Sequence, residues 1–273
     1  AYWHRSEFPL PATYKPGGHL FVTFKGVPYA AAVWINGHKL GGIKGAFIRG
    51  DFDISPYVKS GVNAIAVKVS PVPHPGIPQE ESLTAGAGNN GGAQAQDGPT
   101  FIATEGWDWI PSVRDRNTGL WQDVVLRSTG DVRVGDAHVI TALAPDNGEA
   151  DIGIDVPVTN VSDKPVRATV RATIRDRAGA LQPIVVSRTL EVAPGTRTVR
   201  FAAAEFAALK VRHPRLWWPN GYGKPELHDL DVDVLQGTAL SDHAHTAFGI
   251  RSVTYELSLV DHTGHLRRVE ADF

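Results

Sequence analysis

One stretch of the chain, Ala103–Leu126, reads ATEGWDWIPSVRDRNTGLWQDVVL and combines aromatic rings with charged side chains. Three of the seven Trp residues and six charged residues lie in it: Trp107, Trp109, Trp121, Glu105, Asp108, Arg114, Asp115, Arg116 and Asp123. This combination suits a sugar site, because indole rings cover the apolar C–H faces of a pyranose and charged groups bind its hydroxyls. The alternative is a β-domain whose Trp residues are core and whose charges lie on the surface.

Glycoside hydrolysis is one reaction that this stretch could serve. It needs two carboxyl groups flanking the scissile bond, about 5–5.5 Å apart for retention and about 6.5–9.5 Å apart for inversion. Four carboxylates are candidates: Glu105, Asp108, Asp115 and Asp123. Ion pairing with Arg114 and Arg116 would lower the pKa of Asp115 and Asp123, which is wrong for a general acid. No sequence feature selects a pair, so the residues alone leave a catalytic role open.

The remaining residues that could carry chemistry form no site that we recognise. The absence of Cys excludes disulfides, thiolate zinc sites and a Cys nucleophile. His243 and His245 would share one face of a strand, and His262 and His265 are three residues apart, but neither pair has a clear third ligand. No dinucleotide fingerprint, phosphate-binding loop or nucleophile-elbow motif occurs. We therefore predict no metal and no cofactor.

Length and charge narrow the class of protein. The 273 residues predict about two domains. A net charge of -2 and a pI of about 6.6, without Lys/Arg clusters beside aromatics, argue against nucleic acid as a partner. The chain has no run of 18 or more apolar residues, so no membrane span is predicted. Residues 1–20 lack the apolar region of a signal peptide. The chain starts at Ala1 without Met, so we expect a mature chain or a fragment.

The segments on either side of the Trp-rich stretch are expected to be strands. In the first part, strands are predicted over Leu20–Phe24, Ala31–Ile35, Phe47–Ile54 and Asn63–Val69, and Asn36-Gly37 is a hairpin signal leading into His38–Leu40. Short strands broken by Gly and Pro indicate a sandwich or jelly roll. Pro71–Thr100, rich in Pro, Asn and Gly, is predicted as a long loop, either one wall of a pocket or a surface insertion.

A second set of strands follows a boundary at Ser128–Asp131. Strands are predicted over His138–Thr141, Ala150–Val158, Val166–Ile174, Ile184–Val192, Thr196–Phe201, His228–Leu235 and His245–Leu257. This number of strands suits an immunoglobulin-like sandwich. Ala202–Val211 has the only helix-like pattern. Leu216–Gly223, with paired Trp before Pro-Asn-Gly, is interpreted as a packed corner with a tight turn.

Seven short motifs, in order along the chain, resemble those of glycoside hydrolase family 2. They are Tyr2–Phe8 (an opening of the W-Y-R-x-x-F kind), Ala32–Gly37 (V-W-x-N-G), Asp53-Ile54 (F-D-I), Gly106–Pro111 (G-W-D-W-x-P of the β-mannosidase and exo-β-glucosaminidase branches), Thr118–Val124 (G-I-W-R-D-V), Trp217–Gly221 and Phe248–Arg251 (F-G-I-R). Each motif is weak alone, but their shared order is specific, and they span nearly the whole chain.

This resemblance implies an all-β organisation in front of a TIM barrel. A jelly-roll (galactose-binding-like) sugar-binding β-sandwich is expected over residues 1–129 and an immunoglobulin-like β-sandwich over 130–251. Residues 252–273 would begin a following segment, truncated before the barrel. An ordinary (β/α)₈ barrel takes about 250 residues. The family's catalytic pair is two Glu on barrel strands, one in an Asn-Glu step, and this chain contains no Asn-Glu dipeptide. The catalytic residues are therefore expected to be absent from it.

What carries over by resemblance is a contribution to the rim of the terminal-sugar subsite. The Asp of the D-W step is Asp108 here, with Trp109 beside it as a wall, and Arg49 is a further candidate for the same rim. Trp107 and Trp121 are expected to be core.

The implied function is that of the non-catalytic N-terminal region of a retaining exo-β-glycosidase whose partners are a β-linked oligosaccharide and the missing barrel. The alternatives are a free-standing carbohydrate-binding module with an immunoglobulin-like spacer and a structural or adhesion pair of sandwiches. A periplasmic or secreted location is expected by resemblance.

Overall fold

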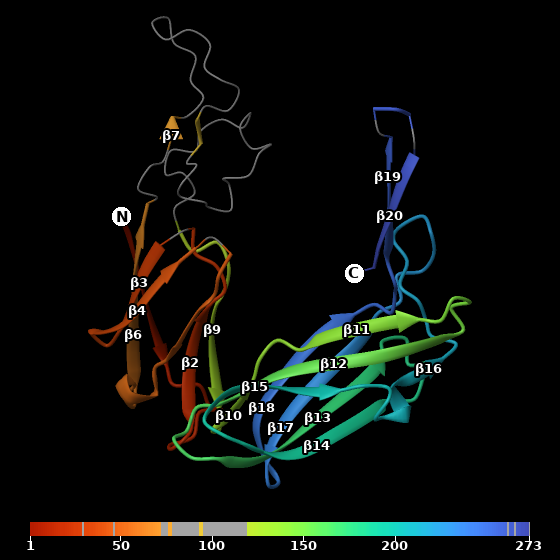
Figure 1. Ribbon diagram of the computed structural model, residues 1–273. Helices are drawn as coiled ribbons and strands as arrows, with labels where there is room; N and C mark the ends of the chain where they lie inside the picture. The colour runs from red at the N-terminus through yellow and green to blue at the C-terminus, as the bar shows by residue number, and fades with distance from the viewer. Residues whose placement is uncertain are drawn as a thin grey trace, which may run out of the picture. The chain divides into compact units, whose positions relative to one another are not determined.

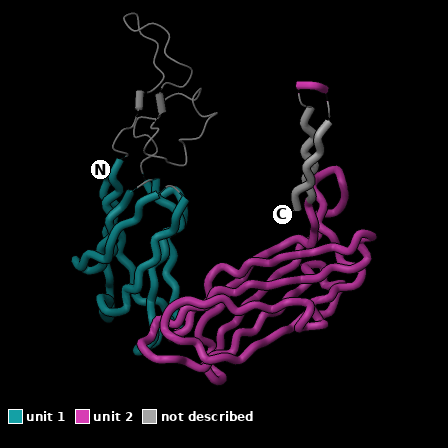
Figure 2. The backbone as a smooth tube through the Cα atoms, in the orientation of Figure 1, with its two compact units in different colours: residues 1–129 teal, residues 130–273 magenta. Residues whose placement is uncertain are grey.

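A computed structural model describes residues 1–28, 30–45, 47–71, 76–77, 93–94, 119–260, 262–264 and 266–272 of the chain. In this part of the chain the regular elements are strands and two three-residue 3₁₀ helices, η1 (Ser55–Tyr57) and η2 (Ala207–Leu209). Two compact units form, residues 1–129 and residues 130–273 (Figure 2). The prediction of an all-β protein built from two sandwiches is confirmed.

The first unit is a sandwich of two antiparallel sheets (Figure 1). One sheet has the order β1-β6-β3-β4 and the other β5-β2-β9. The strands are β1 (Tyr2–Pro9), β2 (His19–Phe24), β3 (Ala30–Ile35), β4 (His38–Lys44), β5 (Gly50–Asp53), β6 (Val62–Ser70) and β9 (Val124–Thr129). A further two-residue pair joins β7 (Gly76–Ile77) to β8 (Ala93–Gln94) inside the stretch predicted as a loop, whose other residues mostly lie outside the described ranges.

The core of this unit lies between the two sheets because alternate residues of each strand point inward. On β3 the side chains of Ala31, Val33 and Ile35 are buried, while those between them are partly exposed. They meet residues of the opposite sheet such as Leu20 and Val22 in one apolar cluster. Period-two alternation in the sequence thus translates directly into a two-layer core.

The predicted Asn36-Gly37 hairpin is confirmed. Both residues have positive φ, 48° and 87°, as a two-residue hairpin loop requires. The Asn36 side chain also donates to the carbonyl of Tyr57 at 2.8 Å and to Oδ1 of Asn63 at 2.8 Å, and accepts from the amide of Ala64 at 2.9 Å. This Asn therefore both makes the turn and ties it to the neighbouring strand β6.

The second unit is also a sandwich of two antiparallel sheets. One sheet pairs β12 with β10, β11, β15 and β16, and the other has the order β14-β13-β17-β18. The strands are β10 (Val132–Val134), β11 (His138–Leu143), β12 (Glu149–Asn160), β13 (Val166–Asp176), β14 (Ile184–Val192), β15 (Gly195–Phe201), β16 (Lys210–Arg212), β17 (His228–Gln236) and β18 (Ala239–Phe248), followed by the hairpin β19 (Thr254–Val260) and β20 (Leu266–Asp272). Ile154, Val170 and Val232 join the two sheets in one core.

Several predicted elements differ from the observed ones. The strand expected from Phe47 begins only at Gly50, since Gly45 turns the chain with a φ of 137° and leaves Phe47 exposed. The helix-like pattern at Ala202–Val211 becomes η2 and β16, because Lys210–Arg212 pairs with β12 and buries Leu209 and Val211. Tertiary pairing here overrides the helix propensity of the Ala-rich sequence.

Two further corrections concern the ends of the units. The single strand predicted over His245–Leu257 is two strands, β18 and β19, with Gly249–Val253 between them. Strand β1 was not predicted, because nearly all of its side chains are exposed on both faces and it carries no alternating apolar pattern.

Candidate functional site

The end of the first sandwich where β2, β4 and β6 finish is the candidate site. In one sheet Ala30 lies opposite both Ser70 and Lys44, and in the other Phe24 lies opposite both Gly50 and Val124. Three connections therefore leave from this end: residues 25–29, 45–49 and 71–123. We call it the loop end. Loops gathered at one end of a sandwich are where such folds place binding residues.

Arg49 lies at the loop end, directly before β5. Its side chain is exposed, as are those of Phe47 and Ile48 in the same connection. The structure thus places one of the three predicted site residues at this end. Asp108 and Trp109 lie outside the described residues. The flanks of the segment that carries them, Ser70 and Val124, are both at the loop end.

Trp121 is not core, contrary to the prediction. It is 36% exposed, and its indole meets the ring of Phe47, itself 69% exposed, edge to face at 6.2 Å. The other side of the indole lies on Gly26, where a Cβ would come within 2.7 Å of Cε2 and Nε1. Only a residue without a side chain allows this approach, so Gly26 seats Trp121 at the surface.

An ion pair completes the described part of the loop end. Nζ of Lys25 lies 3.2 Å from Oδ2 of Asp123, and the Lys25 amide donates to the Asp123 carbonyl at 3.0 Å. Phe47 and Lys25 were not singled out from the sequence, and Trp121 was expected to be core. They come from three separate connections, and only the strand order shows that these connections share one end.

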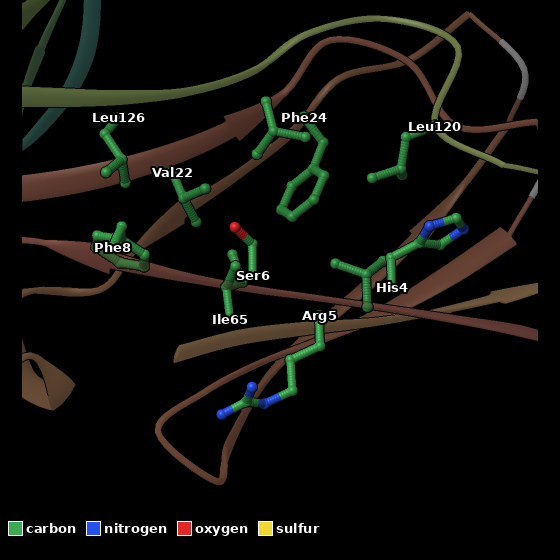
Figure 3. A pocket seen from close by; sticks show the side chains of 11 residues that line it. His4, Arg5, Ser6, Phe8, Val22, Phe24, Ile65, Leu120 and Leu126 are labelled. Carbon is green, nitrogen blue, oxygen red and sulfur yellow. The ribbon is translucent and has the colours of Figure 1, made fainter. Parts of the chain in front are cut away.

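A groove of about 230 Å³ opens along the side of the same sandwich, between the edge strands β1 and β9 (Figure 3). Phe8, Val22, Phe24 and Leu126 face one another in it, with the Ser6 hydroxyl pointing between them. Leu120 also lines it. The lining is mostly apolar, with His4, Arg5 and Ser6 as its polar residues, so the groove offers a sugar fewer hydrogen-bond partners than apolar contacts.

The Thr118–Val124 motif can now be assigned structural roles. Leu120 lines the groove, Trp121 packs against Gly26, and Asp123 pairs with Lys25. Leu120 thus serves the inside of the sandwich, and Trp121 and Asp123 serve its surface.

Asp53 of the Asp53-Ile54 motif fixes the opposite end of the same sheet. Burial raises its pKa, but hydrogen bonds from the hydroxyl and amide of Ser55 and an interaction with His19 outweigh this effect and hold the pKa below its usual range. The Leu20 amide in turn donates to the Ser55 hydroxyl at 2.8 Å. Asp53 is therefore a structural carboxylate that is kept ionised by its turn.

In the second unit, the Trp217–Gly221 and Phe248–Arg251 motifs meet in space. The Trp217 amide donates to the carbonyl of Ile250 at 3.1 Å, and the Arg251 guanidinium lies over the rings of Trp217 and Trp218 at 5.4 and 5.9 Å. Gly249 lies so close to Trp217 that a Cβ would approach its Cβ to 2.5 Å. The predicted corner is packed at Trp217, which lies partly buried against Gly249, whereas Trp218 is 37% exposed, and cation–π contact with Arg251 joins the corner to the strand end.

A charged face covers the β13-β17-β18 sheet. Asp229, Asp231 and Asp233 on the central strand face Arg177, Arg175 and Arg171 on one side and His243 and His245 on the other. Nδ1 of His243 lies 2.9 Å from Asp233 and Nδ1 of His245 lies 3.0 Å from Asp231. The two His residues do share one face of a strand, as predicted. Among the described residues, no group of three or more His, Asp or Glu is arranged to hold a metal ion.

His228 is a buried titratable group in this unit. It is 3% exposed, stacks on Phe248 at 5.5 Å, and neither ring nitrogen has a hydrogen-bond partner among the described residues. Burial lowers its pKa below the usual 6.5; Asp176 opposes the shift and Arg215 adds to it.

The lowered pKa predicts a stability loss in acid that His228→Phe should reduce. Between pH 6.5 and the lower folded-state pKa, the unfolded chain binds the proton and the folded chain does not, so the free energy of unfolding falls as pH falls through this window. Phe keeps the stack on Phe248 without titrating. Thermal unfolding at about pH 7.5 and about pH 5.5 should show a smaller drop in Tm for the variant. An equal drop in both proteins would remove His228 as a cause.

Comparison with known proteins addresses the identity of both units. The family model described as "Glycosyl hydrolase 2 galactose-binding domain-like" matches residues 1–122, and that described as "Glycosyl hydrolases family 2" matches residues 132–251. The chain belongs to glycoside hydrolase family 2. The resemblance drawn from the seven motifs is therefore confirmed.

Individual members of family 2 are similar along almost the whole chain. An exo-β-D-glucosaminidase of Streptomyces avermitilis is 31% identical and covers 94% of this chain, and a mannosylglycoprotein endo-β-mannosidase of Lilium longiflorum is 30% identical and covers 86%. The crystal structure of the exo-chitosanase CsxA of Amycolatopsis orientalis matches 98% of the chain at 28% identity with a TM-score of 0.66.

These family 2 proteins are much longer than the chain. It spans 25% and 24% of the two curated relatives and 27% of the CsxA chain. In the described part of the chain, no helix is long and apolar enough to span a membrane.

Proposed function

We propose that this chain supplies part of the rim of the terminal-sugar subsite in a longer, retaining exo-β-glycosidase. The observation that carries the proposal is the convergence at the loop end. Arg49, the Phe47–Trp121 pair and the Lys25–Asp123 ion pair lie there, together with both flanks of the segment containing Asp108 and Trp109.

The chemistry of the proposed rim is recognition, not proton transfer. A carboxylate at Asp108 can accept two sugar hydroxyls, and a guanidinium at Arg49 can donate to another, while Trp109 covers an apolar sugar face. Such contacts fix position, which lowers the barrier by holding the glycosidic bond in place for groups elsewhere. The catalytic pair is assigned to a further part of the protein, a TIM barrel by family resemblance, so the chain alone is expected not to hydrolyse glycosides.

The substrate class proposed is a β-linked oligosaccharide read from its non-reducing end. Support for the non-reducing end comes from the names of the exo-β-D-glucosaminidases, and the name of the endo-β-mannosidase supports only the β-linkage. β-Galactosidases also match, at lower identity. A β-glucosaminide is the first substrate to test, because the exo-β-D-glucosaminidase of Streptomyces avermitilis is 31% identical over 263 residues.

Arg49→Ala tests the part of the rim that the structure describes. In the longer enzyme this change is expected to lower kcat/KM for a β-glucosaminide by about threefold to tenfold, mainly through KM, because an exposed guanidinium contributes ground-state binding. Arg197→Ala, an exposed Arg on the second unit, is the matched control and should leave both constants unchanged. If kcat and KM of Arg49→Ala equal those of wild type, Arg49 is not part of the rim.

The second candidate function is a free-standing carbohydrate-binding module, which the galactose-binding-like description of the first unit favours. Calorimetry of the chain with simple methyl β-glycosides separates the two. A rim that needs the rest of the enzyme should give almost no binding. A dissociation constant tighter than about 1 mM that is lost in Asp108→Ala would favour the module.

A further inference from the structure

The outer face of the β1-β6-β3-β4 sheet carries two Trp side chains that the proposed rim does not use. Trp3 on β1 is 61% exposed, and Trp34 on β3 is partly exposed. Their ring centroids are 5.1 Å apart and their planes are inclined by 40°. Neither belongs to the core cluster of the first unit. Two exposed rings in contact can cover the apolar face of a ligand.

The strand register explains how two rings on non-adjacent strands come together. Strand β6 separates β1 from β3, with Trp3 opposite Lys68 and Trp34 opposite Ala66. The two indoles meet across β6, and the small side chain of Ala66 leaves space for them there. The outward positions beside them are also small, Ala64 on β6 and Ala32 on β3. The small Ala side chains around the two rings thus leave both indoles projecting from the surface of the sheet.

Charged side chains border the two rings. Arg5 lies opposite Ala66 and Glu7 opposite Ala64, on the same face of β1 as Trp3, and these two residues form an ion pair. Lys68 lies directly opposite Trp3. The result is a small aromatic surface with hydrogen-bond donors and acceptors at its border, rather than a wide apolar patch of the kind that buries a protein partner.

We propose that this Trp platform, formed by Trp3 and Trp34 with Arg5, Glu7 and Lys68, binds a β-linked glycan chain. The rings would stack on the apolar faces of two successive pyranoses, and the charged border would bind their hydroxyls. Each sugar of a β-linked chain presents an apolar C–H face, so two adjacent rings whose centroids are 5.1 Å apart offer contacts to two sugars. The inference rests on the proposed function for its ligand class, since an enzyme of this class meets such polymers.

Calorimetry of the chain with a glucosamine hexamer and with cellohexaose tests the platform. Wild type is expected to bind at least one of them with a dissociation constant of about 0.1–1 mM. Trp3→Ala should weaken binding at least about tenfold, and Trp3→Phe should weaken it less, because it keeps a ring. Tyr222→Ala, which removes an aromatic residue that is 81% exposed on the second unit, is the matched control and should bind like wild type. Binding of both hexamers would indicate recognition of the pyranose faces that they share. Binding of the glucosamine hexamer but not of cellohexaose would add a role for Glu7 in binding the amino groups.

Three results would overturn the proposal. The first is that wild type binds neither hexamer. The second is that Trp3→Ala binds as well as wild type while its Tm is unchanged. The third is that the chain dimerises through this face, which light scattering would show as a wild-type dimer and a Trp3→Ala monomer. Asp108→Ala keeps the two proposals apart: hexamer binding that is lost in this variant but kept in Trp3→Ala would place recognition at the loop end. If the kinetics of the Arg49 and Asp108 variants contradict the proposed rim, hexamer binding that depends on Trp3 would still support the Trp platform.

Discussion

Asp108→Ala in the longer enzyme is expected to lower kcat/KM for a β-glucosaminide at least about tenfold, which corresponds to about 1.4 kcal/mol of lost transition-state stabilisation. The reason is that a carboxylate accepting two sugar hydroxyls makes charge-assisted hydrogen bonds, which are among the stronger polar contacts in proteins. Steady-state kinetics with a chromogenic β-glucosaminide measures the effect. The loss should exceed that of Arg49→Ala, since truncation of Asp108 leaves two hydroxyls unpaired.

Two control variants give this result its meaning. Asp123→Ala removes a carboxylate from the same end of the sandwich, but one that is paired with Lys25 at 3.2 Å and largely exposed, so its effect should be small. Asp108→Asn keeps the shape and one acceptor, and it should fall between wild type and Asp108→Ala. If Asp108→Ala and Asp123→Ala have the same kinetics as wild type, Asp108 has no place in the rim.

Gly249→Ala is expected to destabilise the second unit by about 1–3 kcal/mol. A Cβ at this position would lie 2.5 Å from Cβ of Trp217 and 2.7 Å from its Cγ. Either Trp217 or the strand end must move, and the contact between the indole and Arg251 then weakens. Thermal unfolding should show a Tm lower by several degrees.

Gly153→Ala is the matched control for this prediction. Gly153 also lies in the second unit, on β12, but the nearest atom to an added Cβ is Cβ of Ile140 at an ordinary 3.6 Å. Its Tm should stay near that of wild type or rise slightly, because Ala reduces the entropy of the unfolded chain. Equal Tm values for Gly249→Ala and Gly153→Ala would show that the corner adapts without cost.

The sandwich strands were predictable because one face of each is buried. Ile152, Ile154, Val156 and Val158 are all buried and alternate with more exposed residues, as the sequence pattern indicated. Local patterns failed where tertiary contacts decide the backbone. Strand β1 lacks alternation because it is an exposed edge, and β16 exists only because β12 offers it a partner.

The candidate site was predictable only in part. Arg49 was identified by family resemblance, and its place at the loop end agrees with the proposed rim. The exposure of Trp121 could not be foreseen, since a Trp beside Leu120 in a closing strand has the composition of a core. Its position depends on Gly26, about a hundred residues away in the chain, and on Phe47 in a third connection. Such proximity follows from strand order, which the sequence does not state.

The most direct test of the proposed rim is a crystal structure of the longer enzyme with a β-linked oligosaccharide bound. We expect a carboxylate oxygen of Asp108 within about 3 Å of hydroxyl oxygens of the terminal sugar, with the loop end of the first sandwich facing that sugar. An Asp108 carboxylate more than about 6 Å from every sugar atom, with the loop end facing solvent, would contradict it.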